Sequence, residues 1–262
     1  VTAFLTAAIT LLCAGSFFFG AGAASEKTVA ITFDDGPGNY TAALLDGLKS
    51  RGAKATFFCT GTQAAGRPEL LKRMVREGHQ LANHTQNHKQ LTKLSRAQVR
   101  SEIRLTRDQL VKAGGERTYY IRPPYGSYND TVRQEADAPL ILWSVDTLDW
   151  KYRNADTVYN NIISQTKDGS IILLHDLYKT SVEGALRAIS TLQKKGYEFV
   201  TVEELFARRG ITPQKGKAYS SAPAGSTAAA APEIAVKDVW GGKQITLSSK
   251  TQGATLYYTT DG

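Results

Sequence analysis

Thr28-Val29-Ala30-Ile31-Thr32-Phe33-Asp34-Asp35-Gly36-Pro37 places two adjacent acids directly after a short apolar run. Residues 28–33 are mostly β-branched, aromatic or small, which is typical of a buried strand. Taken alone, Asp-Asp-Gly-Pro is typical of a turn, because Asp favours turn starts and Gly and Pro interrupt regular structure. The stretch predicts a strand that ends in a polar loop, and the rest of the chain decides what this loop does.

Similar apolar runs recur along the chain and alternate with longer amphipathic segments. The predicted strands are 28–33, 55–59, 80–83, 119–122, 140–145, 170–174 and 198–201. This alternation predicts an α/β fold around a parallel sheet. Seven strands with their helices favour a barrel-like (β/α)7 fold, and an open doubly wound sheet is the alternative.

The clearest predicted helix begins after Ser95. The Ser95 side chain can cap the helix while Gln98, three residues later, reciprocates, which is the pattern of a capping box. An apolar face then follows at helical spacing, made of Val99, Ile103, Leu110 and Val111.

Composition bounds the class of protein. Hydrophobic residues make up 42% and charged residues 21% of the 262 residues, as in soluble globular proteins. A net charge of +8 suits an anionic partner such as an acidic cell-wall polymer or a nucleic acid. The Lys and Arg residues are spread along the chain, with no basic cluster interleaved with aromatics, so we expect no nucleic-acid binding.

The N-terminal stretch 1–24 carries no charge and ends in small residues, Gly20-Ala21-Gly22-Ala23-Ala24. This pattern predicts a signal peptide, with an uncleaved membrane anchor as the alternative, and hence an extracellular or cell-surface protein. Removal of the signal leaves Cys59 as the single cysteine, which excludes an intramolecular disulfide. Cys59 closes an apolar run, so we expect a small buried thiol.

Three segments follow the signal. Residues 25–210 form the predicted catalytic domain, and residues 211–232, rich in Ala, Ser, Gly and Pro, form a linker. Residues 233–262 contain three predicted strands, at 234–236, 244–247 and 254–259. A β-sandwich core normally takes about 100 residues, so we expect an incomplete β module at the end of this sequence.

Polar residues follow the predicted strands where each one ends. They are Asp34, Asp35, His84, Arg122, Asp146 and His175. The carboxyl ends of parallel strands share one rim, so these side chains can converge on one site. Each has an ordinary alternative: paired surface histidines, a rigid proline loop or a simple strand exit. A shared site explains all of them at once.

Five motifs in order carry a family resemblance. They are Thr-Phe-Asp-Asp-Gly-Pro at 32–37, His-Thr-x-x-His at 84–88, Arg-Pro-Pro-Tyr-Gly at 122–126, Asp-x-x-Asp-Trp at 146–150 and Leu-Leu-His-Asp at 173–176. From Thr28 to Phe206 the chain resembles the NodB-type polysaccharide deacetylases, also called carbohydrate esterase family four. The resemblance implies a distorted β/α barrel, a divalent metal and an acetylated polysaccharide as substrate. Residues 233–262 resemble the start of a chitobiase-type β-sandwich module.

The resemblance assigns Asp35, His84 and His88 as metal ligands. Zinc is the first choice, and Co²⁺, Mn²⁺ or Ni²⁺ are alternatives. Two imidazoles and one carboxylate also serve iron oxygenases, so the ligand set alone does not name the metal.

The remaining roles are also implied by the resemblance. Asp34 is expected to be the general base, held ionised by Arg122, and the backbone N–H of Tyr125 to bind the oxyanion. His175 is expected to protonate the leaving amine, with Asp146 pairing with it to favour imidazolium. Trp150 and Leu173 are expected to line the pocket for the acetyl methyl group.

Three functions follow from these residues. The preferred one is removal of acetyl groups from N-acetylglucosamine of peptidoglycan or of chitin-like oligomers, with association with the cell wall. The alternatives are an acetylxylan esterase of the same family and a non-catalytic glycan-binding surface protein. Completeness of the motifs favours an enzyme. The sequence leaves the oligomeric state open.

Overall fold

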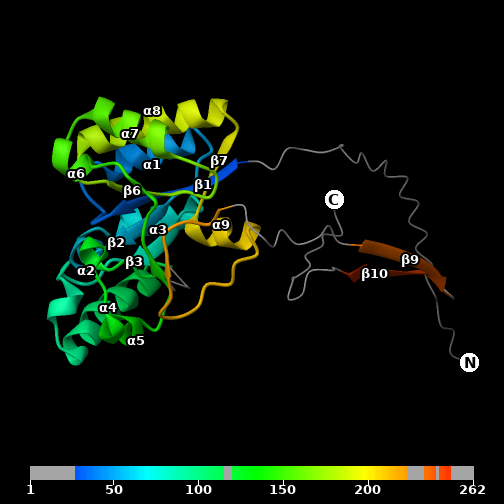
Figure 1. Cartoon of the computed structure of the whole chain (residues 1–262), viewed down its shortest axis with the longest axis horizontal. Helices are drawn as coiled ribbons and strands as arrows, with labels where there is room; N and C mark the ends of the chain where they lie inside the picture. Colours follow the sequence, from blue (N-terminus) through cyan, green and yellow to red (C-terminus); the bar gives the residue numbers. More distant parts are fainter. Residues whose placement is uncertain (1–26, 115–119, 224–232, 240–241, 249–262) are drawn as a thin grey trace, which may run out of the picture.

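The computed structural model describes residues 27–114, 120–223, 233–239 and 242–248 (Figure 1). The predicted signal segment 1–24 and the last predicted strand of the C-terminal module, 254–259, lie outside these residues. Within the described residues, every helix is too short or too polar to span a bilayer.

The centre of the fold is a parallel sheet built around β1. Its strand order is β3-β2-β1-β6-β5, and β7 also pairs with β1. One edge of β1 pairs with β6, and the other pairs with β7 through residues 27–30 and then with β2 through residues 32–34. The strands are β1 (Lys27–Asp34), β2 (Thr56–Cys59), β3 (Gln80–Asn83), β5 (Val145–Asp146), β6 (Ile171–His175) and β7 (Tyr197–Val200).

Two predicted strands are shorter than expected. The predicted strand 119–122 is described from residue 120 on and pairs only at Ile121, which bridges Asn83 and Leu140. Pro123 and Pro124 follow it at once, and proline has no N–H to donate to a ladder. The predicted strand 140–145 is split into β4 (Leu140–Ile141) and β5.

The split has a hydrogen-bonding cause. The N–H of Leu142 donates to Tyr219, whereas the N–H of Ser144 donates to Ile171 of β6. The chain therefore crosses here from one part of the sheet to another. No pairing joins β4 to β5 within the described residues, so the parallel α/β sheet is confirmed and the closed (β/α)7 barrel stays a prediction.

The predicted start of the linker, at residue 211 of the range 211–232, lies before the end of the folded domain. Strand β8 (Ala218–Tyr219) pairs in parallel with β4, and Ala222 is fully buried, with its N–H donated to Gly169. The periodicity of the sequence did not reveal this segment, because backbone hydrogen bonds and single apolar residues attach it to the sheet. An apolar face with a regular repeat would have been visible in the sequence. The folded domain therefore extends beyond residue 210.

Helices cover the sheet in two groups (Figure 1). In the figure α1, α7 and α8 lie together on one side, whereas α2, α4 and α5 lie together elsewhere, in agreement with their contacts. The helices are α1 (Thr41–Lys49), α2 (Gly61–Gly66), α3 (Pro68–Arg76), α4 (Arg96–Lys112), α5 (Asp130–Ala136), α6 (Asp149–Tyr152), α7 (Ala155–Gln165), α8 (Lys179–Lys194) and α9 (Val202–Arg208).

Helix α4 confirms the predicted capping box, since Ser95 accepts from the backbone of Gln98 and the Gln98 side chain accepts from the backbone of Ser95. Val99, Ile103 and Leu110 of the predicted apolar face are buried. Val111 is 48% exposed, so its assignment to that face is wrong. It follows Leu110 directly and is rotated about 100° around the helix axis, away from the sheet.

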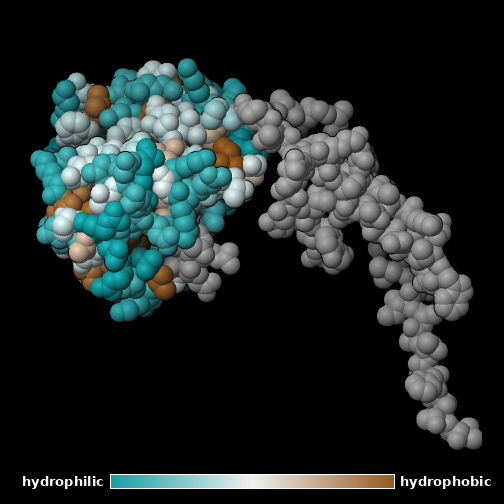
Figure 2. All heavy atoms as spheres, turned by 60° about the horizontal axis from the view of Figure 1, so that its bottom comes forward, coloured by the Kyte–Doolittle hydropathy of each residue, from teal (hydrophilic) through white to brown (hydrophobic). Residues whose placement is uncertain are grey.

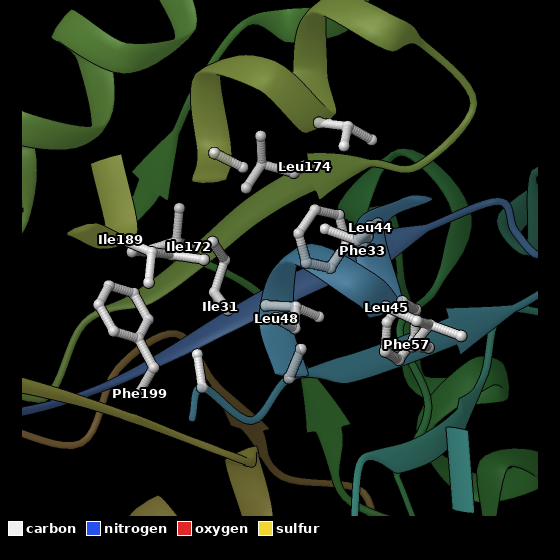
Figure 3. Packing of buried hydrophobic residues seen from close by; sticks show 14 of the residues in the cluster. Ile31, Phe33, Leu44, Leu45, Leu48, Phe57, Ile172, Leu174, Ile189 and Phe199 are labelled. Carbon is white, nitrogen blue, oxygen red and sulfur yellow. The ribbon is translucent and has the colours of Figure 1, made fainter. Parts of the chain in front are cut away.

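The main core lies between the sheet and helices α1 and α8 (Figure 3). Residues 28–34 of β1 are all buried, and Phe33 stacks on Phe57 of β2 with ring centroids 5.5 Å apart. Cys59, at the end of β2, is buried as predicted. The face of the described domain that Figure 2 shows is mainly hydrophilic, with small scattered apolar patches. The burial and packing of β1 fix the position of this central strand, and hence the start of the polar loop that follows it.

The C-terminal segment contains an antiparallel pair, β9 (Glu233–Val239) and β10 (Gly242–Ser248). These strands confirm two of the three predicted for this segment. The β-sandwich module itself stays a prediction.

Truncation of Leu48, which is fully buried on α1 and packs in the core of Figure 3, tests this assignment of the core. Leu48→Ala is expected to lower the free energy of unfolding by about 2–5 kcal/mol, because it removes apolar burial and leaves a cavity. Leu105→Ala is the matched control, since Leu105 of α4 is 40% exposed, and a change below about 0.5 kcal/mol is expected. Urea denaturation measures both, and equal losses would contradict the assignment.

Candidate active site

The predicted site residues gather around one cavity at the carboxyl ends of the strands. The cavity has a volume of about 400 Å³, within the range of ligand pockets. Predicted residues that line it are Asp34, Asp35, His84, His88, Tyr125, Asp146, Trp150, Leu173 and His175. Pro123 and Trp143 complete the lining and were not among the predicted residues. Arg122 lies behind the cavity and is fully buried.

Asp34 ends β1 and forms a buried ion pair with Arg122. The Arg122 Nη1 donates to Asp34 Oδ1 at 2.7 Å and to Thr32 Oγ1 at 2.7 Å. Burial raises the pKa of Asp34 above its ordinary value, and the Arg122 guanidinium opposes this rise. The result is a carboxylate that is 2% exposed, oriented by its partner and more basic than an exposed aspartate.

Backbone carbonyls fix the Arg122 side chain. Its Nε donates to Ile141 O at 3.0 Å and its Nη2 to Leu142 O at 2.9 Å. The guanidinium also lies over the Phe58 ring, 4.1 Å from the centroid. A planar donor group with these partners has one orientation, and this orientation aims Nη1 at Asp34.

His84 follows β3 and presents one defined nitrogen to the cavity. Its Nδ1 lies 2.7 Å from the carbonyl oxygen of Arg122, which can only accept, so Nδ1 carries the hydrogen. Burial lowers the pKa of His84 to about 3 and keeps the imidazole neutral. The lone pair of Nε2 therefore points toward Asp35 Oδ1, 3.4 Å away.

Asp35, His84 and His88 are arranged as metal ligands would be. One potential ligand atom from each lies within 4.8 Å of the others, and His88 Nε2 is 3.3 Å from Asp35 Oδ1. Asp35 Oδ1 is buried and has no hydrogen-bond partner, as expected of an atom reserved for a cation. Two imidazoles and a carboxylate leave positions open for water and substrate, so these residues fit a catalytic divalent ion.

The two histidines reach this geometry from a loop. Residues 84–88 form no helix, and Thr85 and His88 have positive φ values of 67° and 54°. Asn83 Oδ1 accepts from the Thr85 N–H at 2.8 Å, and the Glu102 carboxylate on α4 accepts from the N–H of Asn87 at 2.8 Å. Sequence analysis did not identify these two supports, because they act across elements far apart in the chain.

His175 ends β6 and pairs with Asp149. Its Nδ1 lies 2.9 Å from Asp149 Oδ1, and its backbone N–H donates to Asp149 Oδ2 at 2.8 Å. Burial disfavours imidazolium, yet the hydrogen bond and charge of Asp149, with the charges of Asp34 and Asp35, raise the pKa of His175 to about 9.

The prediction that Asp146 pairs with His175 is wrong. Asp146 Oδ1 instead accepts from the N–H of Leu148 at 2.9 Å, and Asp146 lines the cavity. Asp149 begins α6, is fully buried and also accepts from the Ser181 hydroxyl at 2.6 Å. Both acids belong to the motif at 146–150, so the sequence contained the signal but not the direction of either side chain.

Aromatic residues form the mouth of the cavity. Tyr125 is 68% exposed and Trp150 is 49% exposed, and the Tyr125 ring packs edge-on against His88 with centroids 4.9 Å apart. Tyr125 has a φ of 61°, in the left-handed region, within the Pro124–Gly126 turn. Exposed aromatic faces beside polar groups suit sugar rings, whose C–H faces are apolar.

Asp176 lies against the loop that follows β1. It is fully buried, accepts a hydrogen bond from the Thr41 hydroxyl, and lies so close to Gly36 that a Cβ there would be 2.2 Å from Asp176 Oδ1. Burial raises the pKa of Asp176 to about 7. Glycine at position 36 is therefore required by space beside this carboxyl group.

Known proteins are similar to this chain in sequence. The family described as "Polysaccharide deacetylase" matches residues 21–138. Peptidoglycan-N-acetylglucosamine deacetylase PgdA of Listeria monocytogenes is 42% identical over 198 residues, which cover 75% of this chain and 42% of that protein. Peptidoglycan-N-acetylglucosamine deacetylase of Bacillus cereus is 38% identical over 190 residues, covering 70% of this chain and 69% of that protein. The chain belongs to the polysaccharide deacetylase family.

Solved structures agree with the fold of this polysaccharide deacetylase domain. The "T48 deacetylase with substrate" matches with a TM-score of 0.72 at 42% identity, covering 75% of this chain and 98% of that chain. A family 4 acetyl xylan esterase from Clostridium thermocellum, in complex with a cobalt ion, matches with a TM-score of 0.71 at 33% identity. The match covers 75% of this chain and 100% of that chain. The chain spans less than half the length of the Listeria relative.

The Asp149 pairing in this deacetylase domain predicts how His175 titrates. Asp149→Asn should lower the pKa of His175 from about 9, because it removes the anion bonded to Nδ1. Asp146→Asn is the matched control and should shift this pKa much less. NMR titration of the His175 ring in chelator-treated protein measures both variants, and a larger shift in Asp146→Asn would restore the sequence-based pairing.

Proposed function

We propose that the chain is a metal-dependent deacetylase of N-acetylated cell-wall glycans, acting on N-acetylglucosamine of peptidoglycan or of chitin-like oligomers. One observation carries the proposal: a buried carboxylate with a raised pKa, Asp34, and an imidazole with a pKa of about 9, His175, line the same cavity as the metal-ligand group. Amide hydrolysis needs both a base for water and an acid for the leaving nitrogen. The peptidoglycan deacetylases among its relatives support the substrate class.

Asp35, His84 and His88 would hold the ion, with zinc as first choice and cobalt, manganese or nickel as alternatives. A divalent ion bound there would supply Lewis acidity, which polarises a carbonyl and lowers the pKa of water. The neutral imidazole of His84 and the partnerless Asp35 oxygen support this assignment. The cobalt ion in the related esterase structure agrees with a divalent metal.

Asp34 is the proposed general base. Its Oδ2 lies 3.6 Å from His84 Nε2, so it reaches the space in front of the ligand group where water attacks. Arg122 occupies the other oxygen, Oδ1, and leaves Oδ2 to take the proton. The raised pKa strengthens Asp34 as a proton acceptor.

His175 is the proposed general acid. Its Nε2 lies 4.0 Å from Asp35 Oδ2, at the edge of the ligand group, where it can donate a proton to the leaving nitrogen. Asp149 holds the ring through Nδ1 and stabilises the imidazolium. The backbone N–H of Tyr125 is the proposed donor to the carbonyl oxygen as its negative charge develops.

Leu173 and Trp150 are proposed to surround the acetyl methyl group, because both line the cavity and present apolar surface. Asp146 is proposed to accept a hydrogen bond from a sugar hydroxyl in the same cavity. Secretion or anchoring through residues 1–24 and a β-sandwich module at residues 233–262 belong to the same proposal, since both fit a protein at the cell wall.

Replacement of the base tests the mechanism. Asp34→Asn should reduce kcat for acetate release from chitooligosaccharides by about two to four powers of ten, because the amide cannot accept a proton. Its affinity for zinc should change little, since Asp34 is outside the proposed ligand set. The matched control is Asp108→Asn, an exposed aspartate of α4 that pairs with Arg104, and full activity is expected.

Acetate release is measured on peptidoglycan, chitooligosaccharides and acetylxylan, with and without chelator and added zinc. Retained activity in Asp34→Asn, or loss of its metal, would contradict the assignment of the base. Preference for acetylxylan would favour the esterase alternative. No release from any metal-loaded sample would favour the glycan-binding alternative.

Removal of a ligand tests the metal site separately. Asp35→Ala should weaken zinc binding by at least about 100-fold, since even residues that only support a ligand contribute roughly 10–100-fold. Asp146→Asn is the matched control, because Asp146 lines the same cavity outside the ligand group, and its zinc affinity should stay near that of the parent. Isothermal titration with zinc gives both values. Equal affinities of the two variants would contradict the ligand set.

A further inference from the structure

Helix α4 carries a row of four exposed arginines that the proposed reaction does not use. We call them the arginine row, and they are Arg96, Arg100, Arg104 and Arg107. These positions lie within roughly 80° of one another around a helix of 3.6 residues per turn, and they extend over about 16 Å at 1.5 Å per residue. None of them lines the catalytic cavity. The row is therefore a separate, linear cationic surface.

A buried carboxylate fixes the first two arginines of the row. Glu135 of α5, whose side chain is 6% exposed, accepts from Arg96 Nη1 and from Arg100 Nε, at 2.7 Å each. Arg96 Nη2 also donates to Gln134 Oε1 at 2.7 Å. The Arg100 bond uses Nε, so both Nη groups of Arg100 have no protein partner within the described residues. This guanidinium is oriented before a ligand arrives, which lowers the entropic cost of binding an anion.

The other two arginines keep most of their charge available for a partner. Arg104 pairs with Asp108 at 3.1 Å, but both side chains are about half exposed, and exposed pairs of this kind contribute little. Arg107 has no ion pair in the part of the chain that the structure describes. Among the described residues, four guanidinium groups thus face two carboxylates, and the row keeps a net positive charge.

The residue type and the spacing favour a ligand with repeated phosphate groups. A guanidinium makes forked, charge-assisted hydrogen bonds to phosphate, and all four cations of the row are arginines. Successive members are separated by about 5–6 Å along the axis, at 1.5 Å per residue. This arrangement suits charges repeated along a chain better than one compact anion. The row therefore favours a linear polyanion.

Two other anionic partners suit this helix less well. A helix that lies on a membrane inserts its apolar face, whereas Val99, Ile103 and Leu110 of α4 are buried in the core. Single-stranded nucleic acid is held by aromatic side chains on which its bases stack, and α4 contains no aromatic residue. A phosphodiester polymer without bases or lipid tails fits both observations.

We propose that the arginine row binds a phosphodiester-linked polyanion of the cell wall and retains the protein there. The choice of a wall polymer rests on the proposed function, because an enzyme that acts on wall glycans meets the anionic polymers of the same wall. The catalytic cavity is lined by three aspartates and by no Lys or Arg, so it would repel such a polymer. Retention and catalysis therefore use different surfaces.

Removal of two charges tests the row. Arg100→Gln combined with Arg107→Gln removes one oriented and one unpaired guanidinium, and glutamine is as good a helix former as arginine. Arg76→Gln combined with Arg187→Gln is the matched control, because these arginines are exposed on α3 and α8 and the net charge changes equally. The probe is a synthetic glycerol phosphate oligomer. Calorimetry on the full chain measures its affinity.

The row variant should bind the oligomer at least about fivefold more weakly than the parent, as the loss of two surface ion contacts would give. The control variant should bind as the parent does. The affinity of the parent should fall as salt rises, because exposed charges are screened. Acetate release from chitooligosaccharides should be equal in all three proteins, since neither pair of arginines lines the catalytic cavity.

Cell-wall fragments extend the test to the proposed partner. The row variant should be retained less than the control on untreated fragments. Hydrofluoric acid cleaves phosphodiesters, so this difference should disappear on fragments treated with it. Equal retention of the two variants on untreated fragments would overturn the inference.

The inference is also overturned if the parent does not bind the oligomer, or if both double variants weaken binding equally. The same holds if the row variant loses as much affinity for phosphatidylglycerol vesicles or for polygalacturonate as for the oligomer, since the surface would then recognise a membrane or any polyanion. Failure of the proposed function is seen separately, as no acetate release by the parent. Binding of the oligomer needs no turnover and still decides the inference.

Discussion

The buried ion pair between Arg122 and Asp34 is the interaction on which the site depends. Desolvating two such charges costs several kcal/mol each, and only excellent geometry and further hydrogen bonds offset that cost. Arg122 meets this condition, since it contacts Asp34, Thr32 and two backbone carbonyls and lies over an aromatic ring. Loss of either partner would leave an uncompensated charge in the core.

The same arginine couples the two halves of the site. Its side chain orients Asp34 at the end of β1, while its carbonyl oxygen accepts from His84 and thereby sets the tautomer of a proposed metal ligand. The proposed base and the proposed ligand are thus positioned by one residue that does not line the cavity. The pairing of β1 with β6 similarly brings Asp34 opposite His175.

Local backbone strain is concentrated at this site. Asp35, Thr85, His88 and Tyr125 all have positive φ values, which non-glycine residues rarely adopt. Such conformations persist only where surrounding contacts determine them, and they aim side chains in directions that a regular strand or helix does not allow. The Glu102 and Asn83 hydrogen bonds supply that support around the 84–88 loop.

The sequence by itself determined the parallel α/β class, the capped helix after Ser95 and most of the residues that line the cavity, because hydrophobic periodicity and short motifs are local properties. Only the tertiary structure decided that Asp149, and not Asp146, binds His175 and that residues 218–219 join the sheet. These features depend on side-chain direction and on contacts between distant segments. Two aspartates three residues apart look alike in a motif, and only the turn into α6 places one of them beneath the imidazole.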